Sequence, residues 1–153
     1  SSSLSVQVPL LPKGSPVNFT CLVLLLYIGR IIVLFLAIAA HRTWLTLTAN
    51  RAANSFSPDG LDVSDAGQRL VRAHANCLES FPIFGGLMFL AIVTIHTHLL
   101  NGTVAFWFVA RLGQSITHLL STSPTAVMVR FTFFCIQVGL ACWWLIQLVL
   151  VLK

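Results

Sequence analysis

Apolar residues fill four long segments of this chain, and clusters of polar residues separate them. The first segment follows Ser15-Pro16, the pattern of an N-cap and a first-turn proline, and predicts a helix over about 16–50. At about 1.5 Å per residue this helix exceeds a ~30 Å hydrocarbon core, so its last turns should protrude. The turn-forming sequence NSFSPDGLDVSD then predicts a polar loop over about 54–65.

Three further helices follow from the same pattern. Asn101-Gly102 ends the first of them, the second helix of the chain, and Pro124, in the sequence STSP, starts the last. The predicted ranges are about 65–100, 103–121 and 124–152. The pattern therefore predicts a single all-α domain over 1–153, a bundle of four transmembrane helices.

Composition places these helices in a membrane. Of the 153 residues, 57% are hydrophobic and 8% are charged, whereas a water-soluble domain has about 25% charged residues. The formal net charge of +5 favours anionic lipid headgroups or an anionic ligand. The arginines are scattered, which argues against nucleic acid as a partner. Because the sequence SSSLSVQVPLLPKGSP lacks a basic start and a cleavage pattern, we expect no signal peptide there.

The distribution of positive charge predicts the orientation. Arg42, Arg51, Arg69 and Arg72 surround the first connection, whereas the second connection, HTHLLNGT, has no Lys or Arg. Because positively charged loops remain on the cytoplasmic side, the sequence predicts a multi-pass protein whose first loop is cytoplasmic.

The start of the second predicted helix, RLVRAHANCLESFP, is unusually polar. At 100° per residue, Arg69, Arg72, Asn76 and Glu79 fall within an arc of about 80°, and His74 points to nearly the opposite side. One interpretation is a snorkelling helix entrance with an Arg–Glu pair between helices. That interpretation explains Arg69 but not Glu79, because an unpaired carboxylate this deep in the membrane costs several kcal/mol.

A binding site explains this polar stripe better. Arginine and asparagine suit a carboxylate or a peptide carbonyl, and glutamate suits an ammonium group. Together they describe a small, zwitterionic, peptide-like ligand. Since His74 faces away from the stripe, it could serve a site in a neighbouring copy, which favours a site between subunits of an oligomer. On the third predicted helix, Arg111, Gln114 and His118 share one face at i, i+3 and i+7.

Other polar positions carry weaker signals. His96-x-His98 suggests a metal, but i, i+2 spacing splays across a helix and no third ligand is visible, so no metal site is predicted. Arg30 is read as a structural bond to another helix or a snorkelling side chain at least as readily as a functional group. Trp143-Trp144 is read first as part of an interfacial aromatic belt.

The pattern Arg72-x-His74-x-Asn76-x-x-Glu79-x-x-Pro82, on the second of four predicted membrane helices, resembles the membrane-associated proteins in eicosanoid and glutathione metabolism. The resemblance covers about 16–153. It implies a homotrimer with glutathione sites between subunits, near the cytoplasmic side. It also implies that Arg72, Asn76 and Glu79 bind glutathione and that a neighbouring subunit contributes His74.

The resemblance extends to other positions, with three departures, one of which is His118 in place of the family's third-helix tyrosine. Arg51 resembles the arginine that reaches into the adjacent subunit's site, and Gln114 and His118 occupy positions where relatives place aromatic or histidine side chains against the ligand. Arg111 lies on the same face of that helix and is added to the predicted glutathione-binding residues. The tyrosine that often follows the glutamate is Ser80 here. At the position of the family's catalytic arginine stands Ala126, and Arg130 is the nearest candidate, one turn further on.

These observations predict a membrane-bound glutathione-dependent transferase or peroxidase. Its glutathione thiolate would attack a lipophilic electrophile or hydroperoxide that arrives from the bilayer, with Arg130 and Arg51 as the candidate catalytic residues. The alternative is a non-catalytic member of the same fold that binds lipid or a partner protein. The retained stripe favours the enzyme, and the displaced arginine favours the alternative. A small transporter fits less well, because the charges gather at one end of the bundle.

Overall fold

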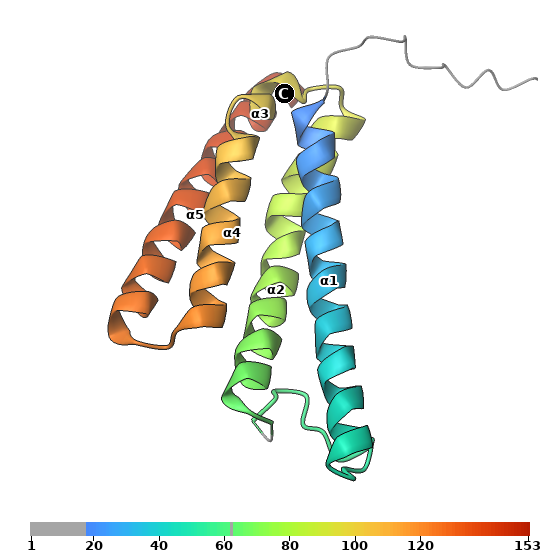
Figure 1. Ribbon diagram of the computed structural model, residues 1–153. Helices are drawn as coiled ribbons and strands as arrows, with labels where there is room; N and C mark the ends of the chain where they lie inside the picture. The colour runs from blue at the N-terminus through green and yellow to red at the C-terminus, as the bar shows by residue number, and fades with distance from the viewer. Residues whose placement is uncertain (1–17, 62) are drawn as a thin grey trace, which may run out of the picture.

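The computed structural model describes residues 18–61 and 63–153, and this part of the chain consists of helices and their connections (Figure 1). Asn18 caps the first helix by accepting a hydrogen bond from the backbone N–H of Cys21. The predicted helix start at Ser15-Pro16 lies outside the described residues. The helices are α1 (Phe19–Thr48), α2 (Asp65–Val93), α3 (His98–Asn101), α4 (Val104–Leu120) and α5 (Pro124–Leu152).

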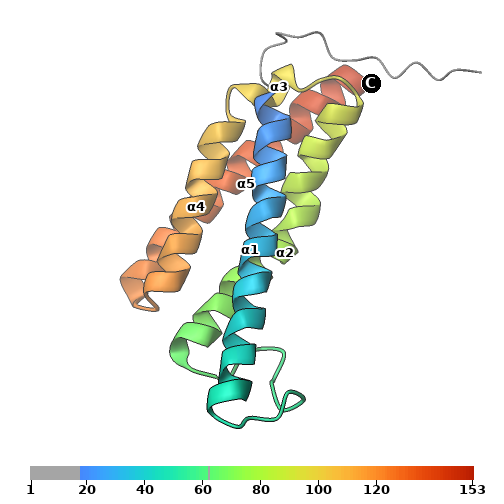
Figure 2. The same ribbon diagram turned by 45° about the vertical axis from the view of Figure 1, so that its right-hand side comes forward.

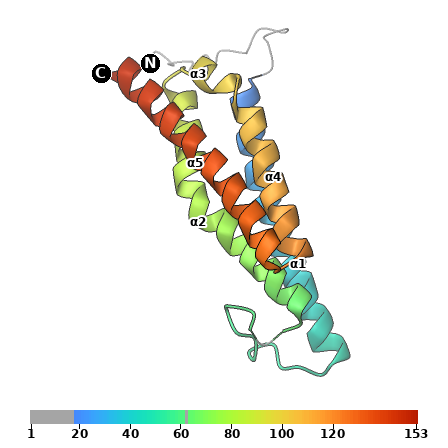
Figure 3. The ribbon, with the colours of Figure 1, turned by 90° about the vertical axis from the view of Figure 1, so that its left-hand side faces the viewer.

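The four long helices form two antiparallel pairs. α1 packs mainly against α2 and α4 mainly against α5, and the two pairs lie against each other (Figures 1 and 2). The short helix α3 crosses the end of the bundle where α1 begins and α5 ends (Figure 3). The α1–α2 connection lies at the other end, where it extends beyond the α4–α5 turn.

The prediction of one continuous helix over 65–100 is wrong. α2 ends at Val93, and Ile95 takes a left-handed conformation with φ 61°. The backbone N–H of His96 donates to Ala91 O at 2.8 Å, and that of Ile95 donates to Ile92 O at 3.1 Å, which is the Schellman pattern of a helix end. Glycine or asparagine usually occupies this position, so a β-branched residue there gives no sequence signal.

The other helix ends follow ordinary capping chemistry. Ser64 accepts from the N–H of Gly67 at the start of α2, and Ser123 accepts from the N–H of Ala126 at the start of α5. Pro124 occupies the first turn of α5, where its missing N–H costs no hydrogen bond. The first connection is longer than the predicted loop of 54–65, because α1 ends at Thr48.

α1, α2 and α5 are each long and apolar enough to cross a membrane. α4, with 17 residues, is shorter, so the fourth span remains a prediction. Large apolar side chains along the outer faces are exposed, for example Leu25 at 67%, Phe35 at 58% and Leu150 at 67%. An outward apolar surface of this extent is typical of helices that face lipid.

Aromatic side chains join the long helices at the centre of the bundle. The ring of Trp107 on α4 lies 5.1 Å from Tyr27 of α1, 5.0 Å from Phe84 of α2 and 6.1 Å from Trp144 of α5, measured between centroids. Trp144 is fully buried and donates its indole N–H to Thr103 Oγ1 at 2.8 Å. Trp144 is therefore a core residue, and of the predicted aromatic belt pair only Trp143 is exposed.

Candidate functional site

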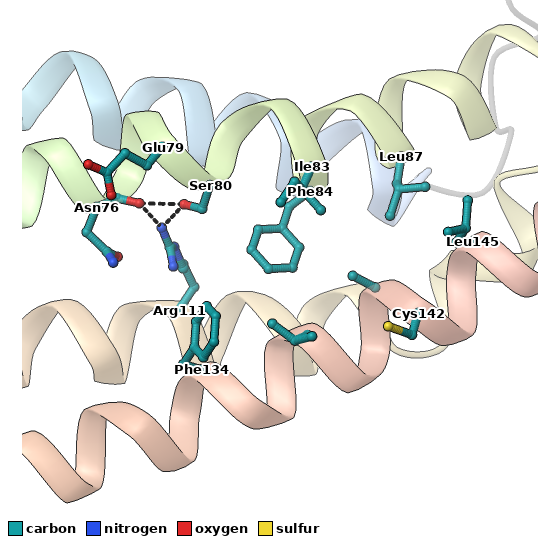
Figure 4. Close-up of a pocket in the computed structure, with 12 residues that line it drawn as sticks. Asn76, Glu79, Ser80, Ile83, Phe84, Leu87, Arg111, Phe134, Cys142 and Leu145 are labelled. Atoms are coloured by element: carbon teal, nitrogen blue, oxygen red, sulfur yellow. Dashed lines mark hydrogen bonds between the residues drawn. The ribbon is translucent and has the colours of Figure 1, made fainter.

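A cavity of about 270 Å³ lies between α2 and α5, and Arg111 of α4 reaches into one end of it (Figure 4). That end is polar and is lined by Asn76, Glu79, Ser80 and Arg111. The rest is apolar. Its lining consists of Ile83, Phe84 and Leu87 on α2 and Phe134, Val138, Ala141, Cys142 and Leu145 on α5. The cavity therefore combines hydrogen-bonding groups at one end with a lipophilic channel.

Arg111 is fully buried, and its side chain joins three helices. It donates to Gln114 Oε1 at 2.9 Å, to Gln137 Oε1 at 3.1 Å and to the backbone oxygen of Asn76 at 2.6 Å, and it also donates to the hydroxyl of Ser80. Gln137 in turn donates to Gln114 Oε1 at 3.1 Å. Because each acceptor is a neutral group, the positive charge of Arg111 stays uncompensated while its geometry is tightly held.

Arg30 of α1 is a second arginine inside the bundle. It donates to Cys77 Sγ on α2 at 3.1 Å and to the hydroxyl of Ser115 on α4. Nearby, the hydroxyl of Tyr27 donates to the backbone oxygen of Cys77 at 3.0 Å and lies 2.9 Å from Ser80 Oγ. The structure shows that Arg30 hydrogen-bonds to neighbouring helices, which is one of the interpretations that the sequence left open.

Four arginines from four helices lie around one histidine, His118. Arg130 (α5) contacts the ring of His118. Arg30 (α1) bonds to Ser115 and Arg111 (α4) to Gln114, both about one turn before His118 on α4. Arg72 (α2) is about one turn after Arg69, which bonds to the backbone oxygen of Leu119. Within the described residues, none of the four forms an ion pair with a carboxylate. This region, called here the cationic centre, is therefore a concentration of positive charge in an apolar bundle.

The chain supplies little negative charge to this centre. Its acidic residues are Asp59, Asp62 and Asp65, which precede or begin α2, and Glu79, which is exposed at the cavity rim. Polar atoms around the centre are also buried without a hydrogen-bond partner in the described structure, namely Arg30 Nη1, Arg111 Nε and Asn76 Oδ1. Buried polar and charged groups are costly unless they are paired, so the region suits an anionic ligand that also offers an N–H donor.

The predicted stripe on α2 meets this centre from one side. Arg69 donates to the backbone oxygen of Leu119 at 2.9 Å and so fastens α2 to the end of α4. Arg72 and Glu79 are exposed, and Asn76 is half-buried. The structure therefore brings Asn76 and Glu79 together with Arg111 at the cavity. The charged groups of Arg72 and Glu79 stay exposed on the surface of the single chain.

His118 and Arg130 also meet, although they belong to different helices. Arg130 Nη1 lies 3.2 Å from His118 Nδ1, and both side chains are half-buried. Gln114 is on the same helix as His118 but bonds to Arg111 and Gln137 inside the bundle.

Two of the predicted site residues lie elsewhere in the single chain. The His74 ring lies 6.0 Å from the ring of Phe35 on α1, on the side of α2 away from the cavity. Arg51 lies in the first connection, where its Nε donates to Ser55 Oγ at 3.2 Å and its guanidinium lies 4.5 Å from the Phe56 ring centroid. Neither residue lines the cavity of its own chain, and its lining also leaves out Arg72, Gln114, His118 and Arg130, which lie nearer to it.

Gln137 is the site residue that the sequence analysis missed. It is fully buried and links α5 to Arg111 and Gln114 of α4. An amide inside the apolar run FTFFCIQVGLACWW was the available signal, since such residues in membrane helices commonly hydrogen-bond to another helix. His96 and His98 have ring centroids 5.9 Å apart, and the described residues place no three potential ligands together for a metal.

The fold and the site define an all-helical integral membrane protein with a cationic, partly lipophilic cavity. A sequence model described as the MAPEG family matches residues 19–150. The chain therefore belongs to this family, the membrane-associated proteins in eicosanoid and glutathione metabolism, and the resemblance seen in the sequence is confirmed. Comparison with curated proteins gave no match, and comparison with solved structures gave none either.

The buried hydrogen bonds around Arg111 predict a large effect of one amide. Gln137→Leu removes an acceptor of Arg111 and a donor to Gln114, so it should lower the free energy of unfolding by about 1–3 kcal/mol. Thermal unfolding in detergent measures the change. Gln147→Leu is the matched control, because Gln147 is half-buried on the same helix and should tolerate the substitution. Equal stability of the two variants would contradict this role for Gln137.

Proposed function

We propose that the protein is a glutathione-dependent transferase or peroxidase that acts on lipophilic electrophiles or hydroperoxides. The observation that carries the proposal is the cavity whose polar end is formed by Arg111 of the cationic centre and whose remaining lining is apolar. Glutathione has two carboxylates, an ammonium group and a thiol, so it offers negative charge to the arginines and an ammonium to Glu79. The apolar channel suits a second substrate that dissolves in the bilayer.

The residues at and around the cavity have defined roles in this proposal. Arg72 pairs with a glutathione carboxylate, Glu79 pairs with the ammonium group, and Asn76 Oδ1, which is buried without a partner, accepts a peptide N–H. Arg111 and Gln114 form the floor beneath the ligand. His118 and Arg130 lie beside the reacting sulfur, and the positive charge of Arg130 raises the thiolate fraction.

The chemistry balances for both substrate classes. With an electrophile, the thiolate forms a carbon–sulfur bond, and the displaced electron pair leaves on the leaving group or on an oxygen that water protonates. With a hydroperoxide, the sulfur takes the terminal oxygen, and the O–O bond breaks to give an alcohol and a sulfenic acid. A second glutathione then reduces the sulfenic acid, which yields a disulfide and water.

The proposed site is completed by other copies of the chain. Arg72 and Glu79 are exposed on a helix that is long and apolar enough to cross a membrane, and charged groups that face lipid are costly. Packing α2 helices around a common axis would turn these groups toward a neighbour, and a closed ring of three copies does so with one repeated interface. His74 and Arg51, which face away from their own cavity, would then serve the adjacent subunit. We place this site and the first loop on the cytoplasmic side, on the basis of the arginines around that loop.

Assembly tests this arrangement directly. Native mass spectrometry and cross-linking in mild detergent should give a homotrimer, because a monomer exposes the polar stripe. A stable monomer that still binds glutathione with full affinity would rule out an intersubunit site.

Binding tests the stripe. Charge-assisted hydrogen bonds contribute about 1.5–3 kcal/mol each, so Arg72→Ala or Glu79→Gln should weaken glutathione binding at least about tenfold by calorimetry. His74→Ala should weaken it less. Arg42→Ala is the control, since Arg42 bonds to Ser57 in the first connection. Unchanged affinity in both stripe variants would show that glutathione does not bind there.

Turnover measurements test whether the arginines stabilise the glutathione thiolate. Arg130→Leu should lose most of the turnover with a generic lipophilic electrophile while it keeps much of the glutathione affinity, because its charge acts mainly in the transition state. Arg51→Leu should lower both quantities. The measurements are the thiolate absorbance of bound glutathione and the rate.

The second candidate function is lipid or partner binding without chemistry. One observation favours it: Ala126, at the position of the family's catalytic arginine, is buried and uncharged. Wild-type protein that binds glutathione but shows neither thiolate at neutral pH nor turnover with electrophiles and hydroperoxides would establish this second function in place of the first.

A further inference from the structure

We propose that His118 is a positioning residue for Arg130: its neutral imidazole accepts a hydrogen bond at Nδ1 and so holds the guanidinium beside the polar end of the cavity. This inference rests on the proposed function, because it assigns the group that orients the thiolate-stabilising cation. It differs from the role that the family resemblance implies for His118, which is direct contact with glutathione.

The contact itself decides the state of the ring. Arg130 Nη1 lies 3.2 Å from His118 Nδ1, and a guanidinium has five donors and no acceptor. Since arginine remains protonated in proteins, Nδ1 must be the acceptor. The imidazole is therefore neutral, with its own proton on Nε2.

The charges around the ring favour this neutral form. Arg130 contacts the ring, and Arg30 and Arg111 bond to residues one turn away on α4, so an imidazolium would add a further positive charge beside three guanidinium groups. Within the described residues no carboxylate pairs with the ring. Histidine is therefore suited to this position as a neutral acceptor, in place of the more usual arginine partner, a carboxylate, which no residue in the described ranges provides.

Arg130 needs such a partner to point inward. It lies six residues after Pro124, roughly 9 Å along α5, in the apolar run VMVRFTFF. A long arginine side chain this close to a helix end would otherwise snorkel toward the membrane surface. No other hydrogen bond of its guanidinium to a described residue competes with the one to His118.

The helix register directs the pair to the cavity. Arg130 is one turn before Phe134, which lines the cavity, and His118 is two turns after Arg111, which forms its floor. The bond between His118 and Arg130 therefore joins the cavity-facing sides of α4 and α5. A cation held there lies next to the polar end, where the proposed thiolate forms.

The test compares two substitutions of His118 in the full-length protein. His118→Leu removes the acceptor, whereas His118→Asn keeps an acceptor oxygen at a similar reach. His118→Leu should lower both kcat and the thiolate fraction of bound glutathione at least about tenfold, while glutathione affinity stays within about threefold. His118→Asn should recover most of that loss. His98→Leu, an exposed histidine on α3, is the matched control and should change neither quantity.

Three results would overturn the proposal. The first is a His118→Leu variant with wild-type thiolate fraction and kcat. The second is a His118→Asn variant that loses as much as His118→Leu, which would deny the acceptor role. The third is weakened glutathione affinity with unchanged kcat, which would show direct ligand contact instead.

Side-chain nitrogen NMR separates this proposal from the proposed function. In protein with labelled histidine, His118 should carry its proton on Nε2, and Arg130→Leu should shift the Nδ1 resonance. If the wild type forms no thiolate, the proposed function fails and the positioning role fails with it, whatever the NMR result. If the wild type is active but Arg130→Leu does not shift the Nδ1 resonance, the positioning role alone is overturned.

Discussion

The structure depends on the need to hydrogen-bond a guanidinium inside an apolar bundle. Arg111 is fully buried, and hydrocarbon offers its N–H groups no partner. Its acceptors come from α2, from α5 and from its own helix, so these three helices must meet at one level. The same requirement places Arg111 at the end of the cavity between α2 and α5, which ties the packing of the bundle to the chemistry of the site.

The cationic centre lowers the stability of the ligand-free bundle but favours the binding of an anion. Arg30 and Arg111 are held by neutral groups inside the bundle, where like charges repel strongly, so packing alone would favour fewer charges there. An anionic ligand changes this balance, because binding to the folded state stabilises it by mass action. The unpaired polar atoms at Arg111 Nε and Asn76 Oδ1 fit the same account, since functional sites commonly keep groups that a purely structural core would satisfy.

The helices themselves were largely predictable. Apolar runs, Ser123-Pro124 and the polar first connection mark three of the long helices to within a few residues. The end of α2 was not predictable, because Ile95 adopts a left-handed conformation that a β-branched residue disfavours, and the helix-closing bonds of Ile95 and His96 accompany it. Trp144 was misjudged for a similar reason. Whether a tryptophan near a helix end faces lipid or the core depends on the partner helix, and here Thr103 accepts its N–H.

The sequence by itself determined that the chain is a helical membrane protein of this family and that Arg72, Asn76 and Glu79 share one face of α2. The membrane-helix class and the shared face need only composition and helical periodicity, which are local properties. The family follows from the motif Arg72-x-His74-x-Asn76-x-x-Glu79-x-x-Pro82, which is also read directly from the sequence. Only the tertiary structure decided that Arg111 bonds to Gln137, 26 residues away on another helix, and that Arg130 bonds to His118. Such pairs depend on the rotation and depth at which helices pack, and interactions across several helices set both.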